Sequence, residues 1–253
     1  MGFYSGPTVV NDQLVFCFDA GSDKCTDADD ALASMRDIAP VAHSSRTDRS
    51  MHGDGANGTG NFTFPTNTGA AKALDLSVSA SNSTSDADDY NNRIDLDDDL
   101  VFADEDAYSF EFWGKLNSNA QNTYHSLGGR GATSPWVIQH KGGANSWTIK
   151  LRDNDGTYRS SSAQTTSSTE WYQMMFTVAT NRDVKFYING VLKDTVASTD
   201  TYLKINRIGG GYASGGNRYN YQGVILCCRI YSKTLSDAEV LQNFNATRGR
   251  VGI

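Results

Sequence analysis

The sequence has no long apolar run, and no segment approaches the ~18 consecutive apolar residues that a membrane-spanning helix requires. Residues 1–12 also lack the basic beginning and the continuous apolar stretch of a secretory signal peptide. An N-myristoylation motif is incomplete, because Gly6 stands where the motif has Ser or Thr. These absences argue against membrane insertion and predict a chain that folds in a cytoplasm.

The sequence also lacks an excess of positive charge. Its formal net charge is −7 and its pI is about 5.0, and many of the acidic residues fall within residues 86–106. The field of such a chain repels phosphate backbones and anionic lipid. We therefore predict no nucleic-acid partner.

Residue patterns typical of catalytic sites are missing. A glycoside hydrolase needs paired carboxylates, and the strand motif Glu-x-Asp-x-x-Glu that supplies them is absent. Glu111 stands alone in its predicted strand, while Glu170 and Glu239 lie at a strand start and at a helix cap. No triad or zinc spacing relates the four histidines, which are His43, His52, His125 and His140. We predict no enzyme activity.

The four cysteines include no Cys-x-x-Cys motif that would favour zinc. Cys227 and Cys228 are adjacent in a predicted strand and therefore point to opposite faces, so they are a poor pair for each other or for a single metal. We expect the cysteines to be small buried hydrophobic residues. A disulfide from Cys17 to Cys227 or Cys228 is the alternative if the first and last strands are neighbours.

What the sequence does contain favours a β-protein. There are 24 Gly, 12 Tyr and only 4 Pro, which suits many strands joined by tight turns. The clearest signal is the segment 171–196, in which predicted strands at 184–188 and 191–196 flank Asn189-Gly190. Asn-Gly favours a type I′ turn, the strongest short-range hairpin signal. An antiparallel meander is expected there.

Further strands are predicted along the rest of the chain. They cover residues 14–18, 61–64, 73–76, 93–96, 107–116, 136–140, 146–152, 157–160, 171–179, 203–208 and 222–231. In 107–116, Tyr108, Phe110 and Phe112 alternate with Trp113 on the other face. The glycine-rich segment 209–218 is interpreted as a flexible connection, because no Gly-Lys-Ser/Thr ending or helix follows it.

One helix is predicted over residues 237–245. Ser236 is its N-cap, Glu239 completes a capping box, and Leu235 and Val240 occupy the hydrophobic-staple positions. Val240, Leu241 and Phe244 form an apolar stripe. We divide the chain into an N-terminal arm (1–13) of a kind that often lies on a neighbour, one jelly-roll domain (14–245), and a basic C-terminal tail (246–253).

These motifs resemble the concanavalin A-like, laminin-G-like jelly roll. The resemblance rests on residues 171–172, 186–191, 207–210 and 231–240, whose order and spacing agree with that family, and it covers roughly residues 14–245. It implies an all-β fold: a two-sheet antiparallel jelly-roll sandwich with one short C-terminal helix.

Other segments resemble a narrower branch, the laminin-G-like proteins of tailed-phage virions, especially those of marine phages. These segments are residues 14–20, residues 48–50 with Gly53 and 57–59, and residues 241–253. Met51-His52 and the insertion 77–92 depart from the pattern. The resemblance implies a non-enzymatic virion protein, a capsid decoration or a tail or fibre component, assembled in the host cytoplasm with other virion proteins as partners. Such parts are often homo-oligomers, including trimers.

A glycan-binding role is the second expectation, either as the adhesive function of a virion part or as a lectin module without a virion. Sugar sites combine aromatic faces with polar groups. The candidates are Trp136, Tyr212, Asn217, Arg218, Tyr219 and Tyr221. Packing of the aromatic residues in the core is the competing interpretation. A remote glycoside hydrolase is the third alternative.

No cofactor is predicted to be required. Calcium is the one metal that the sequence suggests, because residues 86–89 and 97–99 are rich in Asp and could supply hard oxygen ligands. The Asp-x-Asn/Asp-x-Asp-Gly loop pattern is missing, however, and a solvated acidic surface explains the same residues.

Overall fold

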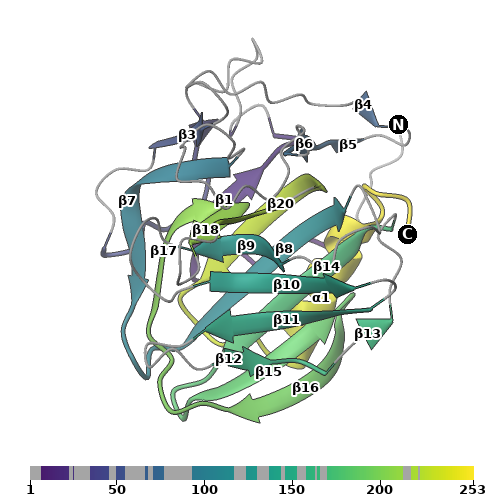
Figure 1. The fold of residues 1–253 in the computed structure, drawn as a ribbon. Helices are drawn as coiled ribbons and strands as arrows, with labels where there is room; N and C mark the ends of the chain where they lie inside the picture. The colour runs from purple at the N-terminus through teal and green to yellow at the C-terminus, as the bar shows by residue number, and fades with distance from the viewer. Residues whose placement is uncertain are drawn as a thin grey trace.

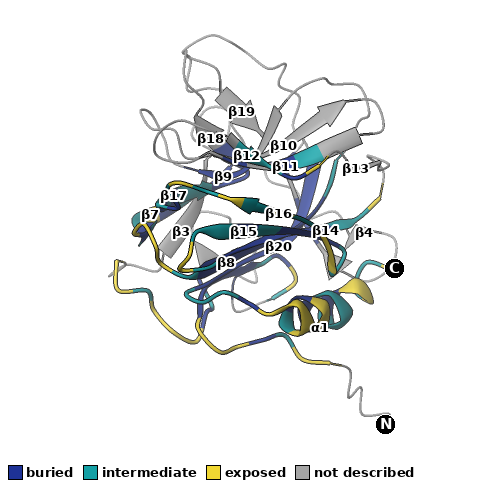
Figure 2. Cartoon of the chain, turned by 90° about the horizontal axis from the view of Figure 1, so that it is seen from below, coloured by how far each residue is buried: buried dark blue, intermediate teal, exposed yellow. Residues whose placement is uncertain are grey.

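The computed structural model describes residues 7–22, 25, 35–45, 50–54, 66–67, 71–76, 93–116, 124–129, 137–143, 146–152, 158–162, 164–165, 170–212, 218–221 and 223–253. Most of the described strands belong to two antiparallel sheets, which we call sheet A and sheet B (Figure 1). The sheets form a sandwich, and a single described helix, α1, lies on the outer side of sheet A (Figure 2). The predicted fold class is confirmed.

Sheet A contains the first and last strands side by side. Its order is β1 (Leu14–Asp19), β20 (Gly223–Tyr231), β8 (Tyr108–Leu116), β14 (Tyr172–Val178), β15 (Asp183–Ile188) and β16 (Val191–Ala197), and β6 (Leu74–Asp75) also pairs with β20.

Sheet B is the wider sheet. Its order is β12 (Tyr158–Ser160), β11 (Ser146–Arg152), β10 (Val137–Gly143), β9 (Tyr124–Gly129), β17 (Leu203–Ile208), β7 (Arg93–Phe102), β3 (Ser50–Asp54) and β2 (Met35–Arg36), and β13 (Gln164–Thr165) pairs with β11. Two small pairs complete the fold: β18 (Gly210–Tyr212) with β19 (Arg218–Asn220), and β4 (Thr66–Asn67) with β5 (Ala71–Lys72).

The main core lies between the sheets and follows the alternation of the strands. In β8, Tyr108, Phe110 and Phe112 point into this core, whereas Trp113 belongs to a separate cluster on the outer face. Phe110 stacks on Phe176 with ring centroids 5.5 Å apart. Strands of a half-buried sheet place alternate side chains on opposite faces, so the predicted orientation of this central strand is confirmed.

The hairpin between β15 and β16 has the predicted turn. Asn189 and Gly190 both have positive φ, 51° and 76°, as a type I′ turn requires. A side chain at position 190 would also meet α1, because a Cβ there would lie 3.1 Å from atoms of Leu241 and Phe244. Gly190 therefore serves both the turn and the seating of the helix.

Helix α1 (Asp237–Arg248) begins as predicted. Ser236 is the N-cap, and the capping box with Glu239 is complete. Leu235 and Val240 are both buried. The helix continues past the predicted end at residue 245, so the predicted boundary between domain and tail falls inside it. No helix in the described part of the chain is long and apolar enough to cross a membrane.

The terminal segments pack on the domain. The described part of the predicted arm, residues 7–13, lies against α1 of its own chain: Gln242 Nε2 donates to the Thr8 carbonyl oxygen at 2.7 Å. At the other end, Arg250 forms paired 2.7 Å hydrogen bonds with the Asp19 carboxylate at the end of β1. The described residues of the arm and the C-terminal residues thus both contact the domain.

All four cysteines are buried and free, so the interpretation as small buried residues is confirmed and the alternative disulfide is not formed. Cys228 faces the main core and Cys227 the outer cluster. Cys17 packs in a further cluster with Tyr231 and Val240. Burial raises the pKa of Cys17 to about 11 and that of Cys25 to about 12.

Several predicted boundaries change. Strand β7 extends to Phe102, beyond the predicted 93–96, because Leu100 and Phe102 continue the buried face. The segment 209–218 contains β18 and the first residue of β19 and is not only a flexible connection, since its ends pair through Tyr212 and Arg218. The strand predicted over 61–64 lies outside the described residues.

Candidate functional site

The carboxylate of Glu111, the only acid in the central strand β8, is fully buried on the outer side of sheet A. Its Oε1 accepts hydrogen bonds from Trp113 Nε1 and from Gln173 Nε2, both at 2.8 Å. Arg229 Nη1 lies 3.2 Å from the same oxygen. A general acid or nucleophile must reach a sugar, and these groups enclose Glu111 instead.

Helix α1 closes this buried polar cluster from the outside. Asn243 Nδ2 donates to Glu111 Oε2 at 3.1 Å and to the Tyr231 hydroxyl at 2.9 Å. Arg229 Nη1 donates to Thr247 Oγ1 at 3.3 Å. Buried polar groups are retained when their hydrogen bonds are satisfied, so the cluster explains how a charged pair can lie beneath a helix.

The other glutamates have structural partners as well. The sequence contains four in all. Glu239 caps α1, Glu105 forms an ion pair with Arg182 at 2.7 Å, and Glu170 accepts a hydrogen bond from the Tyr172 hydroxyl at 2.9 Å. These contacts do not resemble the facing carboxylate pair of a glycosidase.

In the part of the chain that the structure describes, no group of three or more His, Cys, Asp or Glu side chains could hold a metal ion. Asp97, Asp98 and Asp99 lie in β7, where Asp99 forms an ion pair with Lys204. The acidic residues 86–89 lie outside the described part. In the register of β9 and β10, His125 is opposite His140.

Several of the predicted glycan-binding candidates belong to the hairpin of β18 and β19. Both strands pack against β9, and the backbone of Tyr212 pairs with that of Arg218, while Tyr219 pairs with Gly211. Gly209 has φ 76°, and a Cβ there would lie 2.4 Å from Leu76 Cδ1. Only glycine fits this position, which starts the hairpin.

A charged cluster lies at the base of this hairpin. Arg93 Nε is 3.0 Å from Asp95 Oδ1, and Arg207 Nε is 2.9 Å from the same oxygen. Arg93 is buried beneath β18, since a Cβ on Gly210 would lie 3.0 Å from Arg93 Cβ. Arg207 and Asp95 remain partly exposed, with side-chain exposures of 26 % and 14 %. We call the hairpin and these three residues the hairpin site.

The structure brings together part of the predicted sugar site. Tyr212, Arg218 and Tyr219 lie on the hairpin through their paired backbones, whereas Trp136 and Asn217 lie outside the described residues. Tyr221 differs from the prediction: it is fully buried, and its ring packs edge-on against Phe112 with centroids 5.0 Å apart. It is a core residue, which leaves no ring face for a sugar.

Arg93, Asp95 and Arg207 were not among the predicted site residues. The sequence feature that could have indicated Arg93 and Asp95 is the alternation in β7, where these two residues flank the buried Ile94. That alternation identifies residues on the outer face of sheet B. It does not indicate that Arg207, more than a hundred residues later, is paired with Asp95 in the sheet register.

Comparison with known proteins identifies the family. A family model described as the concanavalin A-like lectin/glucanases superfamily matches residues 88–241. The chain belongs to this superfamily. The match covers the strands from β7 onward and the first turn of α1, and it confirms the lectin-like jelly roll inferred above. No curated protein sequence matches the chain.

Solved structures agree on the fold. The binding domain of botulinum neurotoxin serotype D has a TM-score of 0.58 at 15 % identity over 93 % of this chain and 51 % of that chain. The binding domain of botulinum neurotoxin DC in complex with rat synaptotagmin II has a TM-score of 0.58 at 14 % identity, over 94 % of this chain and 52 % of that chain. The serotype D ligand-binding domain in complex with N-acetylneuraminic acid has a TM-score of 0.55 at 14 % identity, over 93 % of this chain and 51 % of that chain. The chain spans about half the length of these structures.

Proposed function

We propose that the protein is a non-enzymatic glycan-binding module, displayed on a phage virion as a capsid decoration or as a tail or fibre component. The proposed binding role rests on the different environments of two carboxylates, those of Glu111 and Asp95. Glu111 is enclosed in a structural cluster, whereas Asp95 and Arg207 remain partly exposed at the hairpin site.

The chemistry of the hairpin site suits sugar hydroxyls. The Asp95 carboxylate accepts hydrogen bonds and the Arg207 guanidinium donates them, and together they can engage neighbouring hydroxyl groups. The adjoining hairpin carries Tyr212, Arg218 and Tyr219. Sugar-binding sites combine a few such polar groups with aromatic residues. Support also comes from the lectin superfamily and from the neurotoxin domain whose complex contains N-acetylneuraminic acid.

The virion role is supported by the resemblance of the two ends of the chain to tailed-phage proteins. Residues 14–20 and 241–253 carry that resemblance, and Asp19 and Arg250 join them through paired 2.7 Å hydrogen bonds. The two segments are thus joined to each other in the folded chain. We propose that the protein belongs to a homo-oligomer assembled in the host cytoplasm with other virion proteins.

A glycan array tests the binding role. The full-length protein is expected to bind a defined group of surface glycans, and binding is expected to persist in the presence of a chelator because no cofactor is required. Binding that appears only with added calcium would assign a metal role to the Asp-rich segments 86–89 and 97–99. Folded protein that binds no glycan with or without calcium would contradict the proposal.

Mass spectrometry of purified phage particles tests the virion role separately. The chain is expected among the virion proteins, and labelling on intact particles would locate it on the head, neck or fibre. If particles lack the chain while the array shows binding, the protein is a lectin module without a virion.

A further inference from the structure

Three of the five large hydrophobic side chains that are exposed in the described part of the chain lie where the turn before β16 meets α1. Val191 is 54 % exposed, Leu192 39 % and Leu241 45 %. Val191 and Leu192 begin β16 directly after Gly190, and a Cβ on Gly190 would lie 3.1 Å from Leu241 Cδ1. The contact between turn and helix therefore brings aliphatic surface together.

Leu192 lies on the side of sheet A that α1 covers. It is opposite Tyr187 in the register of β15 and β16, and directly opposite residues of an antiparallel pair share a face. The Tyr187 hydroxyl donates to Asp237 Oδ1 at 2.8 Å, one helical turn before Leu241. Leu192 and Leu241 thus border the same strip of surface between β16 and α1.

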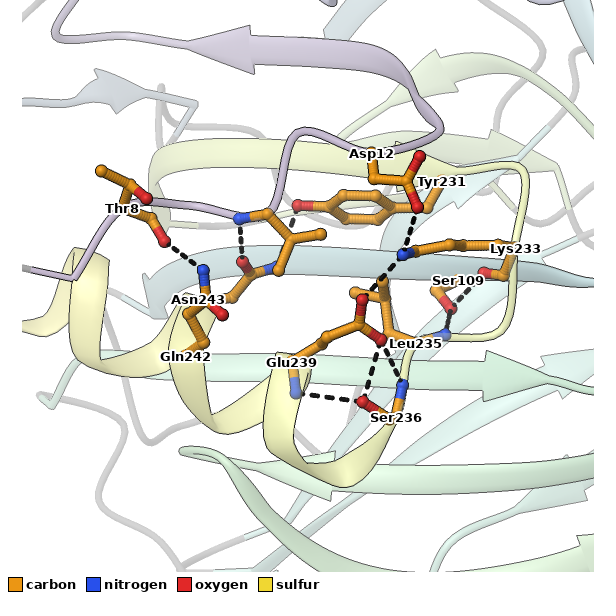
Figure 3. Close-up of polar contacts among 11 residues, drawn as sticks. Thr8, Asp12, Ser109, Tyr231, Lys233, Leu235, Ser236, Glu239, Gln242 and Asn243 are labelled. Carbon is orange, nitrogen blue, oxygen red and sulfur yellow. Dashed lines mark hydrogen bonds and ion pairs between the residues drawn. The ribbon is translucent and has the colours of Figure 1, made fainter.

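The N-terminal arm covers a different side of α1. Figure 3 shows Thr8 of the arm beside Gln242, whose Nε2 donates to the Thr8 carbonyl oxygen at 2.7 Å. Leu241, Phe244 and Arg248 have the i, i+3, i+7 spacing of another helix face. Leu241 and Arg248 are exposed, so the chain itself leaves this face uncovered.

Two cations without an acidic partner border the strip. Lys193 is the extra residue of a bulge in β16 and is exposed, and the Arg248 guanidinium lies 5.7 Å from the centroid of the Phe244 ring. Within the described residues neither cation forms an ion pair, whereas the neighbouring Lys185 is paired with Asp237 at 3.1 Å. On a chain with a net charge of −7, this surface is locally positive. We call Val191, Leu192, Lys193, Leu241 and Arg248 the turn–helix patch.

We propose that the turn–helix patch binds a segment of another protein in which apolar side chains are flanked by Asp or Glu. The apolar side chains of such a segment remove Leu192 and Leu241 from water. Its carboxylates pair with Lys193 and Arg248, which supplies the charge complementarity that gives an interface its specificity. This proposal does not depend on glycan binding or on the virion role.

Other occupants fit the turn–helix patch less well. The exposed hydrophobic side chains are aliphatic, whereas sugar sites use aromatic faces. A symmetric contact between two copies brings Lys193 and Arg248 of both copies to one interface, where the like charges repel. The field of the acidic chain repels anionic lipid.

Selection from a pool of displayed random peptides on the immobilised full-length protein tests the proposal. The enriched peptides are expected to combine Asp or Glu with Leu, Ile or Phe. In fluorescence anisotropy their Kd is expected to rise about tenfold or more for Leu192→Ser/Leu241→Ser, since well-packed apolar side chains dominate interface affinity. Val41→Ser, at a position that is 44 % exposed outside the patch, is the matched control and should leave the Kd unchanged.

Charge reversal supplies a second measurement that does not rely on loss of binding. The variant Lys193→Glu/Arg248→Glu should lose the acidic peptides and bind the same peptides with Lys in place of Asp and Glu. All substituted positions are exposed, so thermal unfolding of each variant is expected to match that of the unmodified chain.

Three results overturn the proposal. The first is enrichment of peptides that are not acidic, and the second is a Kd that is equal in the leucine variant and in Val41→Ser. The third is the absence of an acidic peptide together with binding to phosphatidylglycerol vesicles, or self-association in light scattering, that the leucine substitutions abolish. That result assigns the patch to a lipid surface or to a second copy.

Discussion

The outer faces of the two sheets both carry an arginine–carboxylate cluster, but they place it differently. On sheet A, the Glu111–Arg229 pair lies beneath α1, with side-chain exposures of 0 % and 4 %. On sheet B, the Arg207–Asp95 pair lies beside the hairpin of β18 and β19 and keeps 26 % and 14 % of its side-chain surface exposed. Similar residues are therefore enclosed on one face and remain partly exposed on the other.

The difference follows from what covers each face. Sheet A receives α1, residues 7–13 and the C-terminal residues, so its outer polar groups must find partners inside the protein. Sheet B is covered locally by a short hairpin that packs on β9. Substitutions on the outer face of sheet A should therefore change mainly stability, and substitutions on that of sheet B should change mainly glycan binding.

The largest effect is expected for Glu111→Ala. This change leaves the Arg229 charge buried without its carboxylate, and breaking a buried ion pair from one side costs about 3–5 kcal/mol. Urea unfolding measures the loss. Glu170→Ala, at an exposed strand start, is the matched control and should change stability by less than about 0.5 kcal/mol. Equal losses of stability in the two variants would contradict the stabilising role of the Glu111–Arg229 cluster on sheet A.

Arg207→Ala should produce the reverse pattern. Loss of charged hydrogen bonds costs about 1.5–3 kcal/mol of binding free energy, which corresponds to a roughly tenfold or larger rise in Kd. Stability should fall by less than about 1 kcal/mol, because the ion pair is partly exposed. Titration calorimetry with a glycan selected on the array measures the Kd, and scanning calorimetry of the unbound variant measures its stability. Arg182→Ala, which removes an exposed cation paired with Asp104 and Glu105, should leave binding unchanged.

Acid should weaken the closure of sheet A by the tail. Burial opposes ionisation of Asp19, but the hydrogen bonds and charge of Arg250 keep the pKa of Asp19 below its usual value. The resulting stabilisation is present above the unfolded pKa and is lost as pH falls through the folded pKa. Arg250→Gln should therefore cost about 1.5 kcal/mol at neutral pH, and its difference from the unmodified protein should shrink in acid. Thermal unfolding across pH measures this, and a pH-independent difference would contradict the linkage.

The smallest effect is expected at the start of α1. Ser236→Ala removes the N-cap and should cost about 1 kcal/mol, whereas Ser236→Thr should retain most of the stability. Thermal unfolding of the two variants, measured together with glycan binding, tests whether α1 serves only the sheet A side. A change in glycan affinity in either variant would show that the two faces are coupled.

Local features could be predicted from the sequence because their causes are local. Asn189-Gly190 defines its own turn, and Ser236 with Glu239 defines the helix start. The buried side of α1 could not be predicted from its apolar stripe. Leu241 is 45 % exposed, while Asn243 and Thr247 are buried, because this side of the helix meets the polar Glu111–Arg229 cluster. Of the predicted glycan-binding candidates, Tyr212, Arg218 and Tyr219 lie in the hairpin of β18 and β19.

The remaining site residues depend on long-range register. Arg207 meets Asp95 only because β17 pairs with β7, and no short-range pattern specifies that pairing. Tyr221 follows the glycine-rich segment in sequence, yet its backbone N–H binds the Gly209 oxygen at 2.7 Å and its ring enters the core. Aromatic content alone therefore does not distinguish a sugar platform from a core residue.

The Asn189-Gly190 turn also bears on the chemical ageing of the protein. Asn-Gly sequences deamidate when the glycine backbone nitrogen attacks the asparagine side-chain carbonyl carbon. Here the Gly190 N–H donates to Gln173 Oε1 at 2.9 Å, and Asn189 Oδ1 accepts from the Gln173 N–H at 2.9 Å. Both reacting groups are held by Gln173, so the folded chain should resist deamidation at this site. Once unfolded, the same dipeptide becomes reactive, and isoaspartate at residue 189 would record past unfolding of the domain.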